Sequence, residues 1–181
     1  GLIVLAKGAA GQKITYTKIV LGDGYLEEGQ TPRSLTGVVS PKAVIDITKL
    51  KVNTDGTVAV GGIFTNDQTS DGFFYRELGL YAEDPDPAVG EVLYCYGNCG
   101  DLAEWIPPTG GATIVEKTID IVTAIGTATN VTAYIPADAY ATKEDYETYK
   151  AIALAAQAIA NEAIEIARQA VQTANEAKQA T

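Results

Sequence analysis

From Thr142 to Ala180 the chain contains neither glycine nor proline, and alanine is the commonest residue. Such a composition favours one continuous helix. At 1.5 Å per residue this helix would reach about 57 Å, which is longer than a compact domain can cover. We therefore expect it to need partners outside its own domain.

Apolar residues follow a seven-residue repeat within this stretch. Isoleucine recurs every seventh residue and alanine follows each isoleucine by four, giving the set Ile152, Ala156, Ile159, Ala163, Ile166 and Ala170. Ile164 and Val171 flank this seam and widen it. Isoleucine in the core of a coiled coil favours three strands over two, so the pattern predicts a homotrimer. A single amphipathic helix folding back on its own sheet would bury the same stripe, and this alternative stays open.

The preceding residues show the pattern of a mainly antiparallel β structure. Residues 2–9 predict a short helix that ends at the following glycines. Strand patterns then occupy residues 13–24, 44–52, 57–64, 73–83, 91–98, 112–126 and 130–135. In the first of these, one face of the strand should carry Ile14, Tyr16, Lys18 and Val20 and the other Thr15, Thr17 and Ile19, which predicts one covered face.

Turn residues predict how these strands connect. The stretch Asn53–Gly56 predicts a tight hairpin in which Gly56 has positive φ. Residues 127–129 predict another hairpin between the last two strands, and Pro107 and Pro108 predict an irregular stretch over residues 101–111. The fold class expected is α+β: a short N-terminal helix with an antiparallel sheet or sandwich over residues 1–136, then a coiled-coil helix over residues 137–181.

Composition limits the classes of function. Hydrophobic residues make up 46% of the chain, as in globular proteins, and the net charge is −10. This charge argues against nucleic acid as a partner, and no apolar run is long enough to insert into a membrane, so we expect a soluble protein. Cys95 and Cys99 predict two small structural residues, with a local disulfide or a redox pair as alternatives.

Arg76 and Glu77 are the most conspicuous charged pair of the β region. As neighbours in a strand they should point to opposite faces, which weakens a catalytic role. We expect Glu77 to accept hydrogen bonds from loop amides, Arg76 to pair with an acidic side chain, and Gly79 to admit a close backbone. Because the chain has no histidine and no recognisable serine or metal constellation, we expect no enzyme, no cofactor and no metal.

The order of the motifs resembles a known family. LGDG at 21–24, FYRELGLYAEDPD at 74–86 and GDLAEWIPP at 100–108 are similar to segments in the N-terminal domain of tail-fibre, or tail-collar fibre, proteins of contractile-tailed phages and tailocins. The resemblance spans about residues 1–135. Its motif residues that we expect to be structural are Gly22, Asp23, Gly24, Arg76, Glu77, Gly79 and Tyr81.

The resemblance implies a structural part of a virion tail, or of a tailocin particle, made in the cytoplasm of a bacterial host. This end of the fibre would dock on a baseplate protein, and a distal region outside these residues would recognise the host receptor. The C-terminal helix would begin a trimeric shaft.

Two other functions stay open. One is a receptor- or carbohydrate-binding module on an oligomerising stalk, with Trp105, Tyr94 and Tyr96 as a stacking surface. The other is a general coiled-coil scaffold.

Overall fold

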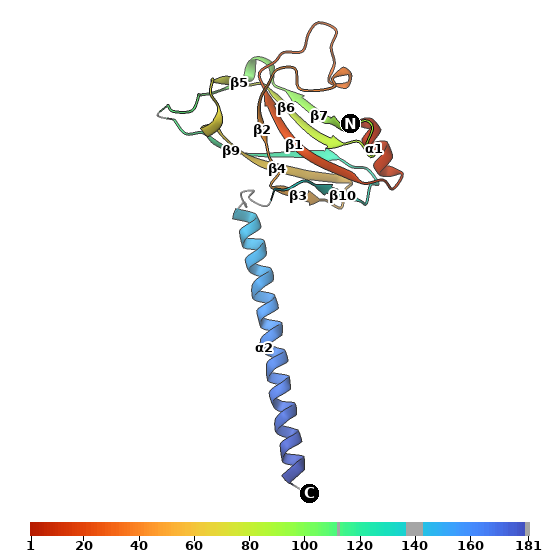
Figure 1. Ribbon diagram of the computed structural model, residues 1–181, viewed down its shortest axis with the longest axis vertical. Coiled ribbons are helices and arrows are strands. Elements are labelled where there is room, and N and C mark those ends of the chain that lie inside the picture. Colours follow the sequence, from red (N-terminus) through yellow and green to blue (C-terminus); the bar gives the residue numbers. More distant parts are fainter. Residues whose placement is uncertain (112, 137–142, 180–181) are drawn as a thin grey trace. The chain divides into compact units, whose positions relative to one another are not determined.

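The computed structural model describes residues 1–111, 113–136 and 143–179 (Figure 1). The chain divides into two compact units, residues 1–140 and residues 141–181. This division falls close to the boundary predicted after residue 136. Each unit is described by itself below.

The first unit begins with helix α1 (Leu2–Ala9), as predicted, and continues mostly as strands. Within its described residues the strands are β1 (Ile14–Gly22), β2 (Pro41–Ile45), β3 (Lys49–Val52), β4 (Thr57–Thr65), β5 (Phe73–Tyr75), β6 (Glu77–Glu83), β7 (Glu91–Asn98), β8 (Glu104–Ile106), β9 (Glu116–Ala124) and β10 (Val131–Ala133). Short 3-10 turns lie at Pro32–Ser34, Asn66–Gln68 and Gly100–Leu102.

The described strands form three sheets. The largest has the order β10-β1-β6-β7, with β2 also beside β1, and the others are β3-β4-β9 and β5-β8. All of these pairs are antiparallel except β1 with β10, which is parallel. The prediction of a short helix followed by antiparallel sheets is therefore confirmed.

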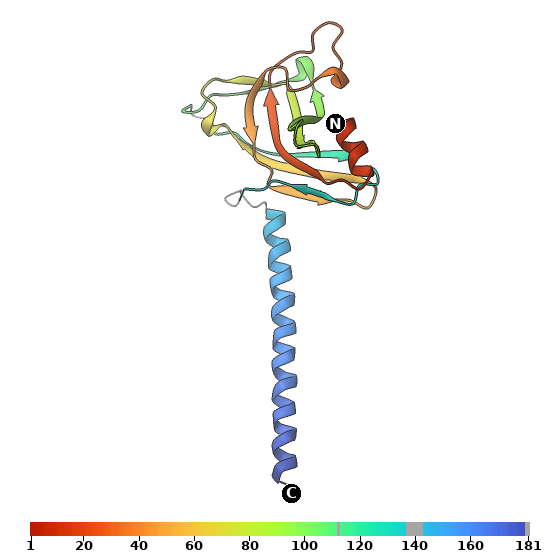
Figure 2. The ribbon, with the colours of Figure 1, turned by 45° about the vertical axis from the view of Figure 1, so that its right-hand side comes forward.

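One hydrophobic cluster joins the two larger sheets and α1, and the ribbon shows these sheets as two layers (Figure 2). It contains Ile14 and Leu80 from the large sheet, Val60 and Ile121 from the three-stranded sheet, and Val4 from the helix. These side chains are buried almost completely. Because neither sheet could bury its apolar face alone, packing of the two layers provides the main stabilisation.

The strand predicted over residues 44–52 is two strands in different sheets. β2 pairs with β1, whereas β3 pairs with β4. Between them the chain crosses from one layer to the other, and Ile47 at the crossing is fully buried. Local propensity does not reveal this crossing because both halves are apolar. The hairpin at Asn53–Gly56 is confirmed, with φ of +77° at Gly56.

The hairpin predicted at residues 127–129 is wrong. β9 pairs with β4 along its whole length, and β10 lies parallel to β1. The two segments therefore belong to different sheets. The turn between them contains Gly126 at φ +58° and takes the chain from one sheet to the other.

Three other predictions about the strands need correction. The predicted strand 73–83 breaks at Arg76, because β5 pairs with β8 while β6 pairs with β1 and β7. β8 itself lies inside the stretch predicted to be irregular, just before its prolines. The alternation predicted for β1 also fails beyond Tyr16, because the register against β6 shifts there and Ile19 is buried too.

The second unit consists of helix α2 (Lys143–Gln179). Its surface carries local ion pairs, such as Lys150 with Glu147 at 3.7 Å and Arg168 with Glu165 at 3.9 Å. Such pairs stabilise a helix only weakly. In the part of the chain that the structure describes, no helix has the length and apolarity required to cross a membrane.

Gly62 on β4 provides a test of the crossing between layers. A Cβ atom on Gly62 would lie 2.6 Å from the carbonyl oxygen of Asp46, whereas one on Gly61 would meet the end of the Asp120 side chain. We expect Gly62→Ala to lower the free energy of unfolding by about 1–3 kcal/mol. Gly61→Ala should stay within about 1 kcal/mol of the wild type, because the Asp120 carboxylate can move. Denaturant unfolding measures both, and equal losses would contradict this explanation.

Candidate functional site

We call the first unit, residues 1–140, the β unit. The carboxylate of Glu77 is the most heavily hydrogen-bonded among its described side chains. Glu77 opens β6 and is fully buried. Its Oε2 accepts from the amides of Gly24 at 2.7 Å and Ser40 at 2.9 Å. Its Oε1 accepts from the amide of Val39 at 2.8 Å and the hydroxyl of Tyr96 at 2.7 Å. The contact with loop amides is the one that the sequence predicts.

Arg76 holds the same loop from its other side. Its amide donates to the carbonyl of Gly22 at 2.9 Å, and its guanidinium donates to the carbonyls of Asp23 and, at 3.0 Å, Gly100. The sequence favours an acidic side chain as its partner, whereas the structure places main-chain carbonyls there. The guanidinium also lies 4.0 Å from the ring centroid of Tyr25, a cation–π contact.

Together these contacts fix the turn Gly22–Asp23–Gly24 after β1. The amide of Asp23 donates to the Ser40 carbonyl at 3.0 Å, and the Gly24 carbonyl accepts from Asn98 at 3.0 Å. A Cβ on Gly22 would lie 2.5 Å from Glu77 Oε2, and one on Gly24 would lie 2.7 Å from the same oxygen. Glycine is therefore required here to let the carboxylate reach the amides.

The remaining motif residues lie against the same loop. The hydroxyl of Tyr81 accepts from the amide of Val38 at 3.0 Å. A Cβ on Gly79 would lie 2.6 Å from Val38, so Gly79 admits the loop side chain that packs there. The seven motif residues predicted to be structural thus form one cluster around residues 22–40.

Tyr96 and Asn98 belong to this cluster although the sequence does not place them there. Asn98 donates to the hydroxyl of Tyr96 at 2.9 Å and accepts from the amide of Gly100 at 2.8 Å. Both lie on β7, two residues apart and hence on one face of the strand. The two-residue spacing of Tyr96 and Asn98 in a strand that pairs with the strand of Glu77 is the only sequence signal that could have indicated their contact with the cluster.

The two charged side chains at the centre of the cluster are engaged. Both oxygens of Glu77 accept hydrogen bonds, and Arg76 contacts main-chain carbonyls and aromatic rings. Within the described residues no group of three or more cysteine, aspartate or glutamate side chains could hold a metal ion. The arrangement acts chemically as a fixed scaffold for the loop.

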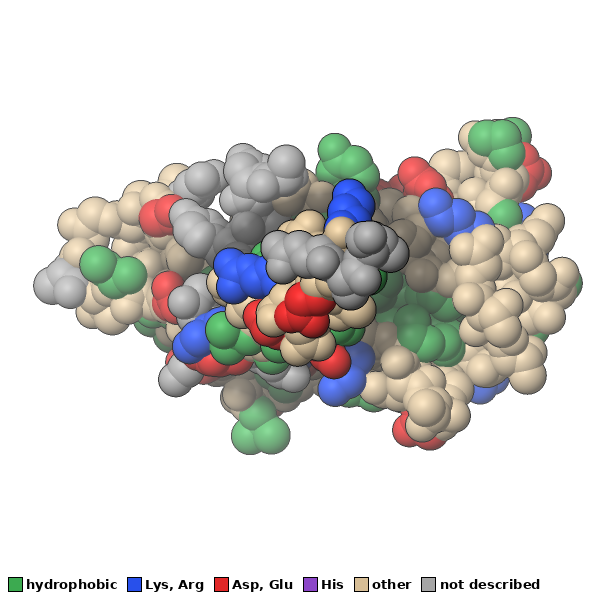
Figure 3. All heavy atoms as spheres, turned by 90° about the horizontal axis from the view of Figure 1, so that it is seen from below, with side chains coloured by type: hydrophobic (Ala, Val, Ile, Leu, Met, Phe, Trp, Pro, Cys, Tyr) green, Lys and Arg blue, Asp and Glu red, His purple; other side chains and the backbone are tan. Residues whose placement is uncertain are grey.

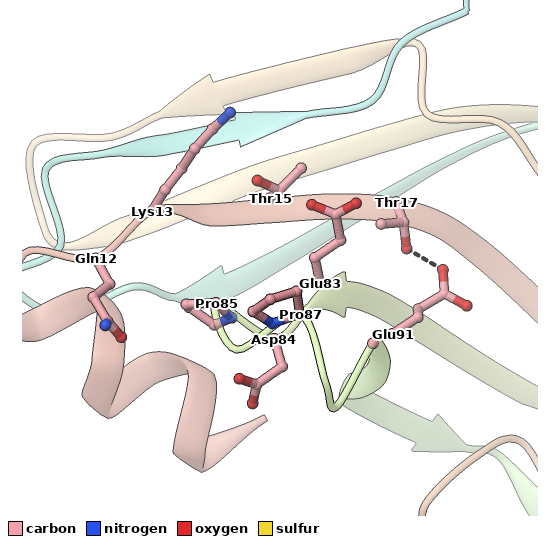
Figure 4. A pocket seen from close by; sticks show the side chains of 10 residues that line it. Gln12, Lys13, Thr15, Thr17, Glu83, Asp84, Pro85, Pro87 and Glu91 are labelled. Carbon is pink, nitrogen blue, oxygen red and sulfur yellow. Dashed lines mark hydrogen bonds between the residues drawn. The ribbon is translucent and has the colours of Figure 1, made fainter.

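A hollow of about 690 Å³ lies elsewhere, between the α1–β1 turn and the loop joining β6 to β7 (Figure 4). Two of its acidic side chains already have partners: Asp84 pairs with Lys7, and Glu91 accepts from Thr17. Lys7 lowers the pKa of Asp84 through this contact. Glu83 and Asp84 point in opposite directions, so the acidic groups do not converge on one ligand.

The two cysteines are both free thiols. Cys95 is partly buried against the core, and burial raises the pKa of its thiol. Cys99 is exposed just after β7.

The aromatic residues of the alternative stacking surface do not form one surface. Tyr94 is buried, packs edge-on against Tyr16 and donates to the carbonyl of Ala124 at 2.7 Å. Tyr96 donates to Glu77, as described above. Trp105 is 50% exposed and packs against Phe74 instead, with ring centroids 5.0 Å apart.

The seam residues of α2 all lie on the surface of the described helix. The side chains of Ile152, Ile159 and Ile166 are 60%, 68% and 61% exposed, and Ala156, Ala163 and Ala170 are exposed as well.

Acidic and basic side chains are interspersed among the coloured atoms seen in Figure 3.

Comparison with protein-family models, with curated proteins and with solved structures found no match to this chain. Its function must therefore be inferred from its own residues and their geometry.

The role of Glu77 is testable by an isosteric change. Glu77→Gln replaces one acceptor oxygen with an amide group, which in its better orientation faces the amide of Val39 and the hydroxyl of Tyr96. We expect the free energy of unfolding to fall by about 3 kcal/mol or more, because two buried donors lose their acceptor. Denaturant unfolding measures the loss. Glu83→Gln, an exposed change on the same strand, is the control, and equal stability of the two variants would contradict the role of Glu77.

Tyr96 gives the cluster a pH dependence. Burial raises the pKa of its phenol from 10.0 to about 12, and the neighbouring Glu77 carboxylate adds to this shift. The folded state favours the neutral phenol, so this stabilisation is complete below pH 10 and is lost as the pH rises towards 12. Thermal unfolding at several pH values should show a flatter decline above pH 10 for Tyr96→Phe than for the wild type. Tyr134→Phe, a change at an exposed ring, should keep the wild-type slope, and parallel curves for all three proteins would contradict the assignment.

Proposed function

We propose that the chain is a structural component of the tail fibre of a phage or phage-like particle, and that it attaches a trimeric fibre to the tail baseplate. The observation that carries the proposal is the exposed isoleucine–alanine seam of α2, which needs other chains to cover it. The β unit is then the attachment domain, α2 begins the shaft, and a distal region outside these residues contacts the host receptor. A structural and non-enzymatic role is part of this proposal.

The spacing of the seam supports trimerisation. Ala156 follows Ile152 by four residues and precedes Ile159 by three, so the isoleucines occupy d positions and the alanines occupy a positions of a heptad. Isoleucine at d disfavours two-stranded coils, and alanine at a allows the helices to approach closely. In an isolated helix this apolar stripe would be in contact with water along its whole length. Association with other helices removes the stripe from water.

The positions of the family-like motifs also support the proposal. Residues from LGDG, from FYRELGLYAEDPD and from GDLAEWIPP meet at one place, because Arg76 bonds both the Asp23 and Gly100 carbonyls and Glu77 bonds the Gly24 amide. The segments that carry the resemblance are therefore those that shape one loop cluster. Such a cluster, held together by many hydrogen bonds, suits an attachment domain.

The oligomeric state tests the proposal. Light scattering of residues 1–181 should give three times the mass of one chain, whereas residues 1–136 should give a single chain. Ile159→Asn with Ile166→Asn should abolish the trimer, because each substitution puts a polar group into the core. Leu154→Asn, at an exposed apolar position two residues after a d position and outside the seam, is the matched control and should stay trimeric.

A long form that remains single at high concentration would contradict the trimer and favour the helix folding on its own sheet. Antibody labelling of intact particles tests the location. The β unit should be labelled where the fibre joins the baseplate, and labelling at the distal fibre tip would contradict the proposed orientation.

A further inference from the structure

Three exposed rings are linked beside the Arg76–Glu77 cluster, and the exposed Leu102 follows two residues after Gly100, whose carbonyl accepts from Arg76. We call these four side chains the aromatic patch: Tyr25, Phe74, Leu102 and Trp105. They come from the loop after β1, from β5, from the turn after β7 and from β8. Their exposed fractions are 52%, 45%, 90% and 50%. An exposed apolar cluster of this kind commonly marks an interaction site.

Direct contacts link the rings into one continuous surface. Arg76 lies 4.0 Å from the Tyr25 centroid and 5.5 Å from the Phe74 centroid, and Phe74 lies 5.0 Å from Trp105. Arg76 is itself fixed by the carbonyls of Asp23 and Gly100. The rings are therefore held in place before any partner binds, which reduces the entropy lost on binding.

Further contacts restrict the two outer rings. The Tyr25 hydroxyl donates to Asp101 at 2.7 Å. The Trp105 ring lies over Gly72, where an added Cβ would come within 2.3 Å of it. A fixed tryptophan and tyrosine beside an arginine is the composition of binding hot spots at protein interfaces.

The charges around the aromatic patch are mostly acidic. Asp101 adjoins Leu102 and accepts from the Tyr25 hydroxyl, and Asp71 adjoins the glycine under Trp105. Glu104 precedes Trp105 in β8, so its side chain leaves the opposite face of the strand, where it pairs with Lys117 at 2.8 Å. The positive charge of Arg76 is directed to main-chain carbonyls and rings. A partner with complementary charge would carry lysine or arginine around an apolar centre.

We propose that the aromatic patch is the surface by which the β unit docks on a baseplate protein, and that the partner's surface is apolar with a basic rim. This inference rests on the proposed function. A protein is favoured over a sugar because Arg76 already covers Tyr25 and Phe74, and because the exposed Leu102 adds aliphatic rather than stacking area. A trimer would present three such patches, so weak individual contacts would add up.

The experiment uses purified tail particles from the strain that encodes the chain, with the fibre gene deleted. Purified trimers of wild type, Phe74→Ser, Trp105→Ser and Leu102→Ser are mixed with the particles and sedimented. The wild type should co-sediment, and each variant should bind at least about tenfold more weakly, because truncating a central anchor removes most of its contact. Tyr134→Ser, at an exposed ring on another part of the β unit, should bind like the wild type.

Asp71→Lys tests the charge of the partner. It should weaken binding, and added salt should weaken the wild type, because both reduce attraction to a basic rim. Binding is compared only for variants whose mass and melting temperature match those of the wild type. Leu102→Ser keeps the test valid if Trp105→Ser unfolds, because Leu102 is almost fully exposed.

Each other outcome is decisive. Failure of the wild-type trimer to co-sediment would overturn the proposed function together with this inference. Wild-type binding that all three patch variants retain would overturn the inference alone. Glycan-array binding that Trp105→Ser abolishes, with unchanged binding to particles, would make the aromatic patch a sugar site and overturn it as well. Stronger binding of Asp71→Lys would exclude the basic partner.

Discussion

The β unit depends on one buried carboxylate. Glu77 is the first residue of β6, where it has no exposure to water, and it receives three main-chain amides and one phenol. Burying a carboxylate costs several kcal/mol unless hydrogen bonds replace its hydration. The loop at residues 22–40 supplies the three amides, so the conformation of the loop and the burial of the carboxylate depend on each other. The loop is long and irregular, yet three of its main-chain amides donate hydrogen bonds to the Glu77 carboxylate.

The same constraint determines the residues around Glu77. Gly22 and Gly24 leave room for the carboxylate, and Gly79 leaves room for Val38. Arg76, next in the chain, holds the opposite side of the turn, because its amide donates to the carbonyl of Gly22 and its guanidinium to the carbonyl of Asp23. The break between β5 and β6 at Arg76 is what allows neighbouring side chains to reach the same turn. In a continuous strand they would diverge to opposite faces.

The two units have different physical requirements. The β unit closes its own core, because its two sheets and α1 share one buried cluster. The helix α2 has no such closure within itself, and its isoleucine seam is a surface feature. In the function we propose, the domain that closes its own core is the attachment point, and the helix with the exposed seam begins the shaft. The aromatic patch lies on the self-sufficient unit, where the Arg76 contacts keep its rings in place.

The sequence by itself determined the features that depend on local pattern. The helix over Lys143–Gln179, the helix α1, the Asn53–Gly56 hairpin and the contact of Glu77 with loop amides all follow from periodicity, turn chemistry or the cost of burying charge. These constraints act over a few residues, or on one residue type, and so they are visible in one dimension.

Only the tertiary structure decided which strands pair across long separations. The split of residues 44–52 between two sheets, the parallel pairing of β10 with β1 and the place of Tyr96 beside Glu77 have no local signal, because an apolar strand suits either layer equally well. The choice depends on which arrangement buries the shared core while giving the buried main-chain donors and acceptors partners. That condition involves the whole domain at once, so no segment carries it alone.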